Sequence, residues 1–337
     1  MKYAGIDLHS NNSVVCVIDE NDRVLVKKRV GNDLERVAEL LEAHRQQLCG
    51  VVVESTYNWY WLVDGLQELG FVVHLANACA VQTYSGLKYA DDDSDARHLA
   101  HLLRLGVLPC GHIYPREQRG LRDLSRQRMR LVQQRSRQII AIENTLSRER
   151  GASMSANQVK RLSDDDVAGL GLREEVTLSL QALLAVMRVL DAQIELLEWR
   201  LQQGVRIRDE YRVLLSTPGI GQILGTAIML ETGDVERFEH VGDYASYARC
   251  VGSVHLSNGK KKGEGNTKSG NRYLAWAFVE AAQFARRNSD PAKRFYERKK
   301  ASTNTTVATK ALAHKLARAC YHMLKTGKPF DEARCFA

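Results

Sequence analysis

The order of apolar patterns in the first third of the chain constrains the fold more than any other feature of the sequence. Residues 2–8, 13–19 and 24–30 are three short apolar-rich segments, and turn-forming residues at 19–23 separate the second from the third. Short apolar segments bounded by turn residues are typical of strands joined in hairpins. We therefore expect the chain to open with a meander of three strands.

A different alternation follows this meander. Leucine and valine recur at helical spacing after Asp33, and then come an apolar run at 50–54, a helical pattern at 58–69 and a second apolar run at 71–75. Three hairpin strands followed by helix, strand, helix, strand and helix is the element order of a ribonuclease-H-like α/β domain. We assign this domain to residues 1–115.

Carboxylates stand at two strand ends of this predicted domain. Asp7 ends the first strand and Glu54 ends the fourth, and these two strands are neighbours in such a domain. A helix that starts near Asp91 carries Asp92 and Asp95 at positions i and i+3, hence on one face. The four acids Asp7, Glu54, Asp92 and Asp95 predict an oxygen-lined site for hard divalent cations, which two-metal phosphoryl-transfer sites hold about 4 Å apart.

The run of aspartates from 91 to 95 leaves the choice among its members open. Asp92 has the i, i+3 spacing to Asp95, but Asp91 or Asp93 could reach the metal in its place. Histidines also lie close to the acids, and we name none of them as a ligand because lone histidines at such positions usually serve packing: His9, His98 and His101.

Composition and charge limit the class of partner. The formal charge is +8 and the isoelectric point is near 9.1, which favours a polyanion such as nucleic acid. The seven cysteines form no CxxC pair, so neither a zinc site nor a disulfide framework is expected. No run of about 18 apolar residues and no secretory leader are evident, so we expect a cytoplasmic protein without a membrane span.

Residues 116–205 are expected to form long helices. Between Arg116 and Arg150 there are ten arginines, no lysine and four acids, a composition that indicates a basic helix. This helix is either a solvated face or, as we prefer, a surface that contacts phosphates through residues such as Arg122, Arg126, Arg130 and Arg137.

An apolar repeat with alternating spacings of four and three follows the basic helix. A repeat of this kind is an a/d heptad seam. It fits an antiparallel hairpin with the basic helix, a dimerising coiled coil, or both, and its members are Val176, Leu180, Leu183, Met187, Leu190, Ile194, Leu197 and Leu201.

Residues 206–337 are expected to be a mostly helical domain with two notable loops. The segment STPGIG at 216–221 resembles a helix-hairpin-helix turn, in which backbone N–H groups near Gly219 and Gly221 hold a phosphate. The segment 257–270 is so rich in glycine and lysine that we expect no packed element there.

The second loop is a candidate site of covalent chemistry. Ser257 becomes a nucleophile if metal and lysine stabilise the developing charge, while Ser253, Thr267 and Ser269 compete for this role. The cations expected to contact nucleic acid here are Lys260, Lys261, Lys262, Lys268 and Arg272.

Ordered fragments along the chain resemble one family. The fragments GIDLHS at 5–10, VVVESTYNWYW at 51–61, GFVVHLAN at 70–77 and DxxDA at 92–96 are similar to the RuvC-like DEDD domain of insertion sequence 110 family transposases. The fragments of its C-terminal domain also follow in order: STPGIG, ETGDVERF at 231–238, YASYARCVG at 244–252, SNGK at 257–260, TKSGNRYL at 267–274 and GKPF at 327–330. The similarity is weakest over 151–205.

The resemblance implies a DNA recombinase of a mobile element, guided by a structured noncoding bridge RNA and acting at the bacterial nucleoid. It implies that Asp7, Glu54, Asp92 and Asp95 hold Mg²⁺ (or Mn²⁺), and that Ser257 attacks DNA to form a phosphoserine. It also implies homodimers that pair into tetramers, with sites shared between protomers. The family usually has glycine where this chain has Asn258, and asparagine tolerates the same left-handed backbone.

Two other functions compete with this interpretation. A hydrolytic junction-cutting nuclease needs the acids but not Ser257, and a non-catalytic nucleic-acid-binding scaffold needs only the basic helix and the heptad seam. The aromatic residues after Glu54 could stack on bases but are more often part of a core: Trp59, Tyr60 and Trp61.

Overall fold

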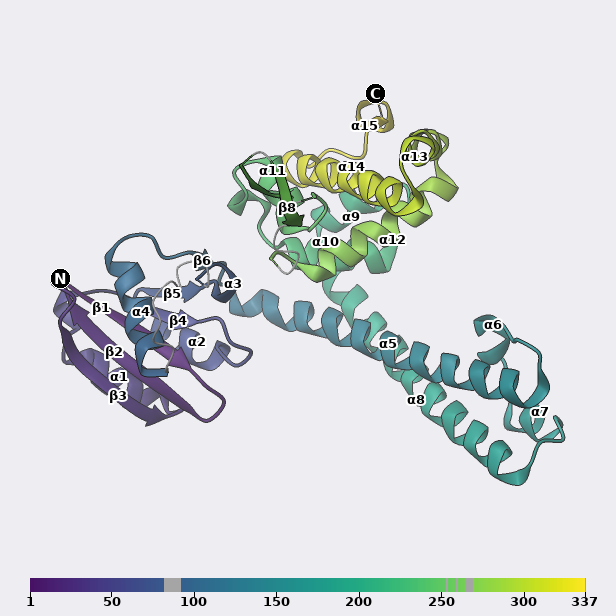
Figure 1. Ribbon diagram of the computed structural model, residues 1–337, viewed down its shortest axis with the longest axis horizontal. Coiled ribbons are helices and arrows are strands. Elements are labelled where there is room, and N and C mark those ends of the chain that lie inside the picture. The colour runs from purple at the N-terminus through teal and green to yellow at the C-terminus, as the bar shows by residue number, and fades with distance from the viewer. Residues whose placement is uncertain (82–91, 253, 259, 265–268, 337) are drawn as a thin grey trace. The chain divides into compact units, whose positions relative to one another are not determined.

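The computed structural model describes the chain apart from residues 82–91, 253, 259, 265–268 and 337. The chain folds into two compact units, an N-terminal unit, Met1–Arg116, and a C-terminal unit, Glu117–Ala337 (Figure 1). Among the described residues, none of the helices has the length and apolar character that crossing a membrane requires.

A six-stranded mixed sheet forms the centre of the N-terminal unit, in the order β3-β2-β1-β4-β5-β6. The first three strands are an antiparallel meander, β4 pairs parallel with both β1 and β5, and β6 closes the edge antiparallel. This sheet is compatible with the predicted ribonuclease-H-like fold, although β6 was not predicted. The strands are β1 (Lys2–Leu8), β2 (Asn12–Asp19), β3 (Val24–Gly31), β4 (Leu48–Glu54), β5 (Val73–Ala76) and β6 (Cys110–Gly111).

Helices cover both faces of this sheet. One face carries α1 (Leu34–Glu42) and α2 (Tyr60–Glu68), whose apolar residues form a core with alternate residues of β1 and β4. Trp59 is buried in this core, and Tyr60 and Trp61 pack against it, as expected for core aromatics. The other face carries α4 (Asp92–Arg104), and the short helices η1 (Arg45–Gln47) and α3 (Ala78–Val81) lie in the connections.

A long helical hairpin opens the C-terminal unit. Helix α5 (Arg116–Arg150) runs antiparallel to α8 (Glu174–Val205), which is the intramolecular hairpin that the sequence predicted as one of two arrangements (Figure 1). The short helices α6 (Ala156–Val159) and α7 (Asp164–Ala168) lie in the connection between them. The predicted seam faces inward in most positions, but Leu184 is fully buried where Leu183 was expected.

The rest of the C-terminal unit is helical around one apolar core that includes Tyr244, Phe278 and Leu316. The expectation of no packed element over 257–270 was wrong, because β7 and β8 form an antiparallel ribbon there. The elements are α9 (Asp209–Leu215), α10 (Gln222–Thr232), η3 (Val235–Arg237), α11 (Val241–Tyr247), β7 (Val254–Ser257), β8 (Lys260–Glu264), α12 (Arg272–Asn288), α13 (Asp290–Ser302), α14 (Thr305–Thr326) and α15 (Glu332–Phe336).

Candidate active site

The sheet register places Asp7 beside Glu54. Ile6 pairs with Val53 across the parallel strands β1 and β4, so the next residue of each strand is an acid. Asp7 is buried, with 2% of its surface exposed, and Glu54 is half-buried. The prediction that these strands are neighbours is confirmed.

Both acids lie on the face of the sheet that α4 covers. Ala4, Ile6 and Leu8 belong to the core on the α1–α2 side, and strand residues alternate between faces, so Asp7 lies on the opposite side. On β4, Val52 packs with Leu99 of α4, so Glu54, two residues later, lies on that side too.

The direction of α4 brings its acidic first turn toward the same strand ends. In the last turn of α4, His101 bonds to Asp22 and Arg104 donates to the carbonyl oxygen of Glu20; both partners closely follow Asp19, the β2 residue that pairs with Lys2. The last turn of α4 therefore lies near the start of β1. The first turn, with Asp92 and Asp95, must then point toward the strand ends where Asp7 and Glu54 lie.

Gly5 permits α4 to approach the sheet this closely. A β-carbon at Gly5 would lie 2.0 Å from the carbonyl oxygen of Ala96 and 2.8 Å from the backbone nitrogen of Ala100. Such distances are incompatible with any side chain unless the helix moves. The absence of a side chain at Gly5 therefore allows the backbone of α4 to pack directly against β1, on the face of the sheet that carries both acids.

The predicted acids have the chemistry of a hard-cation site. Asp7 and Glu54 are oxygen donors of the kind that magnesium prefers. Asp95 is exposed in the first turn of α4; the side chains of Asp92 and Asp93 and all of Asp91 lie outside the described residues. Within the described part, no three Asp, Glu, His or Cys residues form a group that could hold a metal.

His9 is a neighbour of the site that the sequence did not assign. Its Nε2 lies 3.2 Å from Oδ2 of Asp7, and its carbonyl oxygen accepts hydrogen bonds from the side chains of Asn32 and Asn58 at 3.0 and 2.9 Å. These bonds fix the turn after β1, so His9 can orient the Asp7 carboxylate. The adjacency of DLH in the sequence was the available signal.

Ser257 ends β7 at the turn of the β7–β8 ribbon, opposite Lys260. The next residue, Asn258, has a φ of 52°, so the expectation that asparagine adopts the left-handed backbone is confirmed. Lys260 is exposed. The side chains of Ser257, Lys261 and Lys262, and all of Lys268, Ser253 and Thr267, lie outside the described residues.

The residues that follow the ribbon, Gly270 and Asn271, contact the end of α11 and cap the N-terminus of α12. Gly270 has a φ of +87°, and a β-carbon there would lie 2.6 Å from the carbonyl oxygen of Tyr247. The backbone of Asn271 bonds to the same oxygen, and its side chain accepts hydrogen bonds from the first N–H groups of α12. Arg272, the first residue of α12, is exposed and donates to the Tyr273 hydroxyl.

A buried ion cluster holds this anchor to the base of the hairpin. Glu231 of α10 has 1% of its surface exposed and accepts hydrogen bonds from Arg122 at 3.1 Å, Arg126 at 2.5 Å and Asn271 at 2.7 Å. Burial alone would raise the pKa of Glu231. The hydrogen bond from Arg126 and the two positive charges outweigh burial and hold the pKa below its usual value.

The predicted arginine surface is therefore divided in two. Arg122 and Arg126 form ion pairs with Glu231 of α10. Helix α8 provides another acidic partner for α5, because its Glu198 pairs with Arg128 at 2.5 Å. Arg130 and Arg137 are exposed on α5. Only such exposed arginines present their guanidinium groups to a phosphate.

The STPGIG turn packs more tightly than a phosphate-binding turn requires. At Gly219 a β-carbon would lie 2.4 Å from the carbonyl oxygen of Ala281, so this residue contacts the backbone of α12. Gly221 is exposed at the N-terminus of α10, and none of the described side chains caps that end. The backbone donors at Gly221 are thus the part of the turn suited to an anion.

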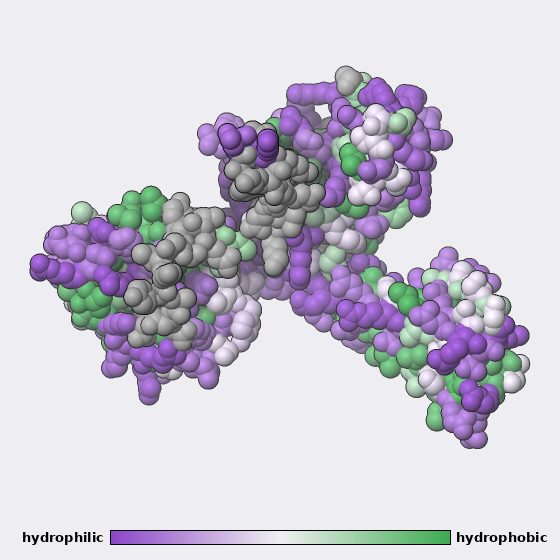
Figure 2. Space-filling view, viewed as in Figure 1, coloured by the Kyte–Doolittle hydropathy of each residue, from purple (hydrophilic) through white to green (hydrophobic). Residues whose placement is uncertain are grey.

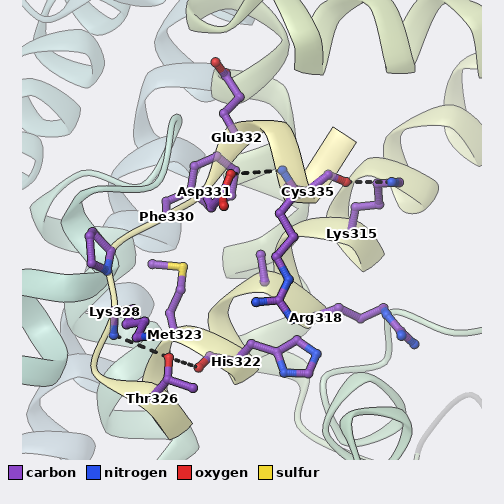
Figure 3. Close-up of a pocket in the computed structure, with 13 residues that line it drawn as sticks. Lys315, Arg318, His322, Met323, Thr326, Lys328, Phe330, Asp331, Glu332 and Cys335 are labelled. Atoms are coloured by element: carbon purple, nitrogen blue, oxygen red, sulfur yellow. Dashed lines mark hydrogen bonds between the residues drawn. The ribbon is translucent and has the colours of Figure 1, made fainter. Parts of the chain in front are cut away.

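A pocket of about 790 Å³ lies between α14 and the chain that leads into α15 (Figure 3). Arg318, His322 and Arg334 line it, and Lys315 donates to the carbonyl oxygen of Cys335 at 2.6 Å. Burial, together with the charges of Arg334 and Arg318, lowers the pKa of His322. Lys328 and the acids Asp331 and Glu332 also line it, so groups of both charges surround this pocket, and the sequence did not indicate it.

Comparison with known proteins agrees with this arrangement. A family described as "Transposase", with the DEDD-type domain of IS110 elements, matches residues 4–149, and the "Transposase IS116/IS110/IS902 family" matches residues 211–297. The chain contains both transposase domains of the IS110 family. As a transposase of this family it has DNA as a partner, and its DEDD-type domain suggests the use of a divalent metal.

Individual relatives extend the similarity to most of the chain. A Pseudomonas aeruginosa protein named "Probable family 20 transposase" is 24% identical over 95% of this chain and 96% of its own length. The protein of insertion element IS110 from Streptomyces coelicolor is 32% identical over 50% of this chain and 41% of its own length. That of insertion element IS116 from Streptomyces clavuligerus is 27% identical over 43% and 36%.

Proposed function

We propose that this IS110 family transposase cuts and rejoins DNA through a covalent phosphoserine at Ser257, with Mg²⁺ (or Mn²⁺) held by Asp7, Glu54, Asp92 and Asp95. The observation that carries the proposal is the register that sets buried Asp7 beside Glu54, with the acidic first turn of α4 directed toward them. A buried carboxylate is costly unless it is paired or binds a cation.

The protein residues have separate tasks in this reaction. The Ser257 oxygen forms a bond to phosphorus and loses its proton, while the bond from phosphorus to a deoxyribose oxygen breaks and that oxygen gains a proton. The phosphoserine conserves the bond energy, so reversal with another strand rejoins DNA without a cofactor. The bound metal would stabilise negative charge on the phosphate oxygens.

Exposed cations supply the contacts to nucleic acid in this proposal. Among the described side chains they are Arg130 and Arg137 on α5 and Lys260 and Arg272 beside the ribbon. We add Lys261, Lys262 and Lys268 from the sequence alone. Backbone donors at Gly221 add an anion site. We include in the proposal a structured bridge RNA as guide and a homodimer that pairs into a tetramer, with acids and serine contributed by different protomers.

A denaturing gel tests the covalent step. With Mg²⁺ and DNA carrying the element ends, we expect a labelled strand to migrate with the protein after boiling in detergent, and Ser257→Ala to abolish this band. Ser269→Ala, which removes an exposed hydroxyl at the other end of the loop, is the matched control and should retain it. A covalent band that persists in Ser257→Ala contradicts the assignment.

A hydrolytic nuclease is the second candidate, because the acid site is built entirely within the N-terminal unit. It predicts strand cleavage without any covalent band, retained by Ser257→Ala and lost in Asp7→Asn. Binding that is unaffected by both variants, without cleavage by the unmodified protein, would instead identify a scaffold.

A further inference from the structure

Tyr57 is an exposed aromatic residue in the loop that follows Glu54. Its surface is 83% exposed, whereas Trp59 is 9% exposed and belongs to the core on the α1–α2 side of the sheet. The visible face of the N-terminal unit mixes hydrophilic and apolar residues (Figure 2), so exposure alone does not distinguish Tyr57. Its position beside the two strand-end acids does.

Hydrogen bonds on both sides of Tyr57 hold this loop in one conformation. On one side, the Thr56 backbone N–H donates to the Glu54 carbonyl oxygen at 2.9 Å. The Thr56 hydroxyl spans the loop and donates to Oδ1 of Asn58, also at 2.9 Å. On the other side, the Asn58 side-chain amide donates to the His9 carbonyl oxygen at 2.9 Å. Both neighbours of Tyr57 are therefore bonded within the fold, and the exposed ring stands on a fixed base.

These bonds place Tyr57 at the same edge of the sheet as the acids. Glu54 precedes it by three residues, which span at most about 11 Å. Asn58 ties the loop to the turn that follows Asp7. One strand of DNA carries a phosphate for about every 3.4 Å of helix axis. A phosphate held by the acids therefore leaves Tyr57 within reach of the nucleotides next to it, on the order of one to three positions away.

A tyrosine ring at this place suits a nucleobase better than a phosphate. Phosphates are contacted by cations and backbone N–H groups, whereas the phenol ring presents a flat apolar face. Every nucleobase has a π face that stacks on such a ring, and one stacked base raises affinity by about tenfold or more. Because the loop is already fixed, binding does not have to order it.

We propose that Tyr57 stacks on an unpaired nucleobase next to the phosphate that the acids hold, and so positions the DNA strand for cleavage. The base must be unpaired because a base inside a duplex is covered on both faces by its neighbours. Strand exchange supplies such a base, since the nucleotides beside a cut leave their former partner before the strand is rejoined. This inference rests on the proposed acid site, and it adds a contact to a base where the proposed function has contacts to phosphates.

DNA binding measured with Ca²⁺ in place of Mg²⁺ tests the proposal without requiring cleavage. With the full-length chain and DNA carrying the element ends, Tyr57→Ala should weaken binding by about tenfold or more. Tyr57→Phe keeps the ring and should bind as the unmodified protein does. Since the side chain is exposed, thermal unfolding of both variants should be unchanged.

Abasic nucleotides identify the partner of the ring. One abasic nucleotide is placed in turn at each of the first few positions on either side of the element boundary. At one position, we expect it to weaken binding to the unmodified protein about as much as Tyr57→Ala does, and to have no further effect on Tyr57→Ala. Replacing the base at that position by any other base should change little, because stacking tolerates every base.

Val72→Ala is the matched control. Val72 is 60% exposed in the same unit but directly precedes β5, whose other end pairs with Glu54, so it lies at the far edge of the sheet and its loss should leave binding unchanged. Equal binding by Tyr57→Ala and the unmodified protein overturns the proposal, as does a loss in Tyr57→Ala that is the same on every abasic DNA. Coupling in a protein that forms no covalent serine adduct would overturn the proposed chemistry but not this contact.

Discussion

Two parts of the candidate site are held in place by different means: the acids Asp7 and Glu54 at the end of two strands, and Ser257 on the β7–β8 ribbon. Asp7 and Glu54 are fixed by the register of a central sheet with helices on both faces. Ser257 lies on a two-stranded ribbon whose following residues are anchored through Asn271 to a buried charge cluster. Backbone hydrogen bonds therefore position the first group, and a side-chain network positions the second. Isolated two-stranded ribbons are weak alone, so the anchor matters more there.

The largest expected effect tests the acid half of this comparison. Asp7→Asn keeps the shape of the side chain but removes its charge. We expect the rate of DNA cleavage to fall by on the order of a thousandfold, because several kcal/mol of metal-assisted stabilisation of the transition state would be lost. Thermal unfolding should change little or improve, since a buried carboxylate is removed.

Asp22→Asn is the control for this prediction. Asp22 binds Arg97 near the middle of α4 and His101 in its last turn, so its loss alters contacts of the same helix without changing the strand-end residues Asp7 and Glu54. Cleavage should be retained. Equal loss in both variants would show that the helix position, and not the carboxylate at Asp7, limits the reaction.

The next effect tests the network that holds the ribbon. Glu231→Gln leaves two buried or half-buried arginines without their counter-charge and should destabilise the C-terminal unit by about 2–4 kcal/mol in urea unfolding. Glu198→Gln, which breaks the more exposed pair with Arg128, should cost less than about 1 kcal/mol. Similar losses from both variants would contradict a special role for Glu231.

The same carboxylate predicts a pH dependence. The pKa of Glu231 is lowered in the folded protein, so its contribution to stability is complete above the pKa of an unfolded glutamate, about 4.3, and is lost as the pH falls through its lower folded value. Urea unfolding between about pH 5 and about pH 3 should show a decline that is shallower in Glu231→Gln. Parallel declines in the two proteins would count against this assignment.

The two halves also differ in how far the sequence predicted them. Strand patterns placed Asp7 beside Glu54 because the neighbours of a β strand in this fold follow from element order. The ribbon was missed because glycine and lysine in 257–264 hide the alternation of a strand. Glu231 was missed because it lies inside an apolar helical segment and its partner Arg122 is 109 positions away. The number of arginines on α5 also overestimated the positive charge available to nucleic acid, because Arg122, Arg126 and Arg128 pair with acids that are distant in the sequence.

The smallest effect concerns the hinge of the ribbon. Gly270→Ala must place a β-carbon 2.6 Å from the Tyr247 carbonyl oxygen at a φ of +87°, so we expect a loss of about 1–3 kcal/mol of stability. Gly327→Ala is the matched control, since Gly327 has a φ of +66° with open space around it and should cost about 1 kcal/mol. If the anchor positions the ribbon, Gly270→Ala lowers formation of the covalent serine adduct more than Gly327→Ala does, even at a temperature where both variants are folded. Equal adduct formation would show that the ribbon tolerates a displaced hinge, and that the side-chain network matters for stability alone.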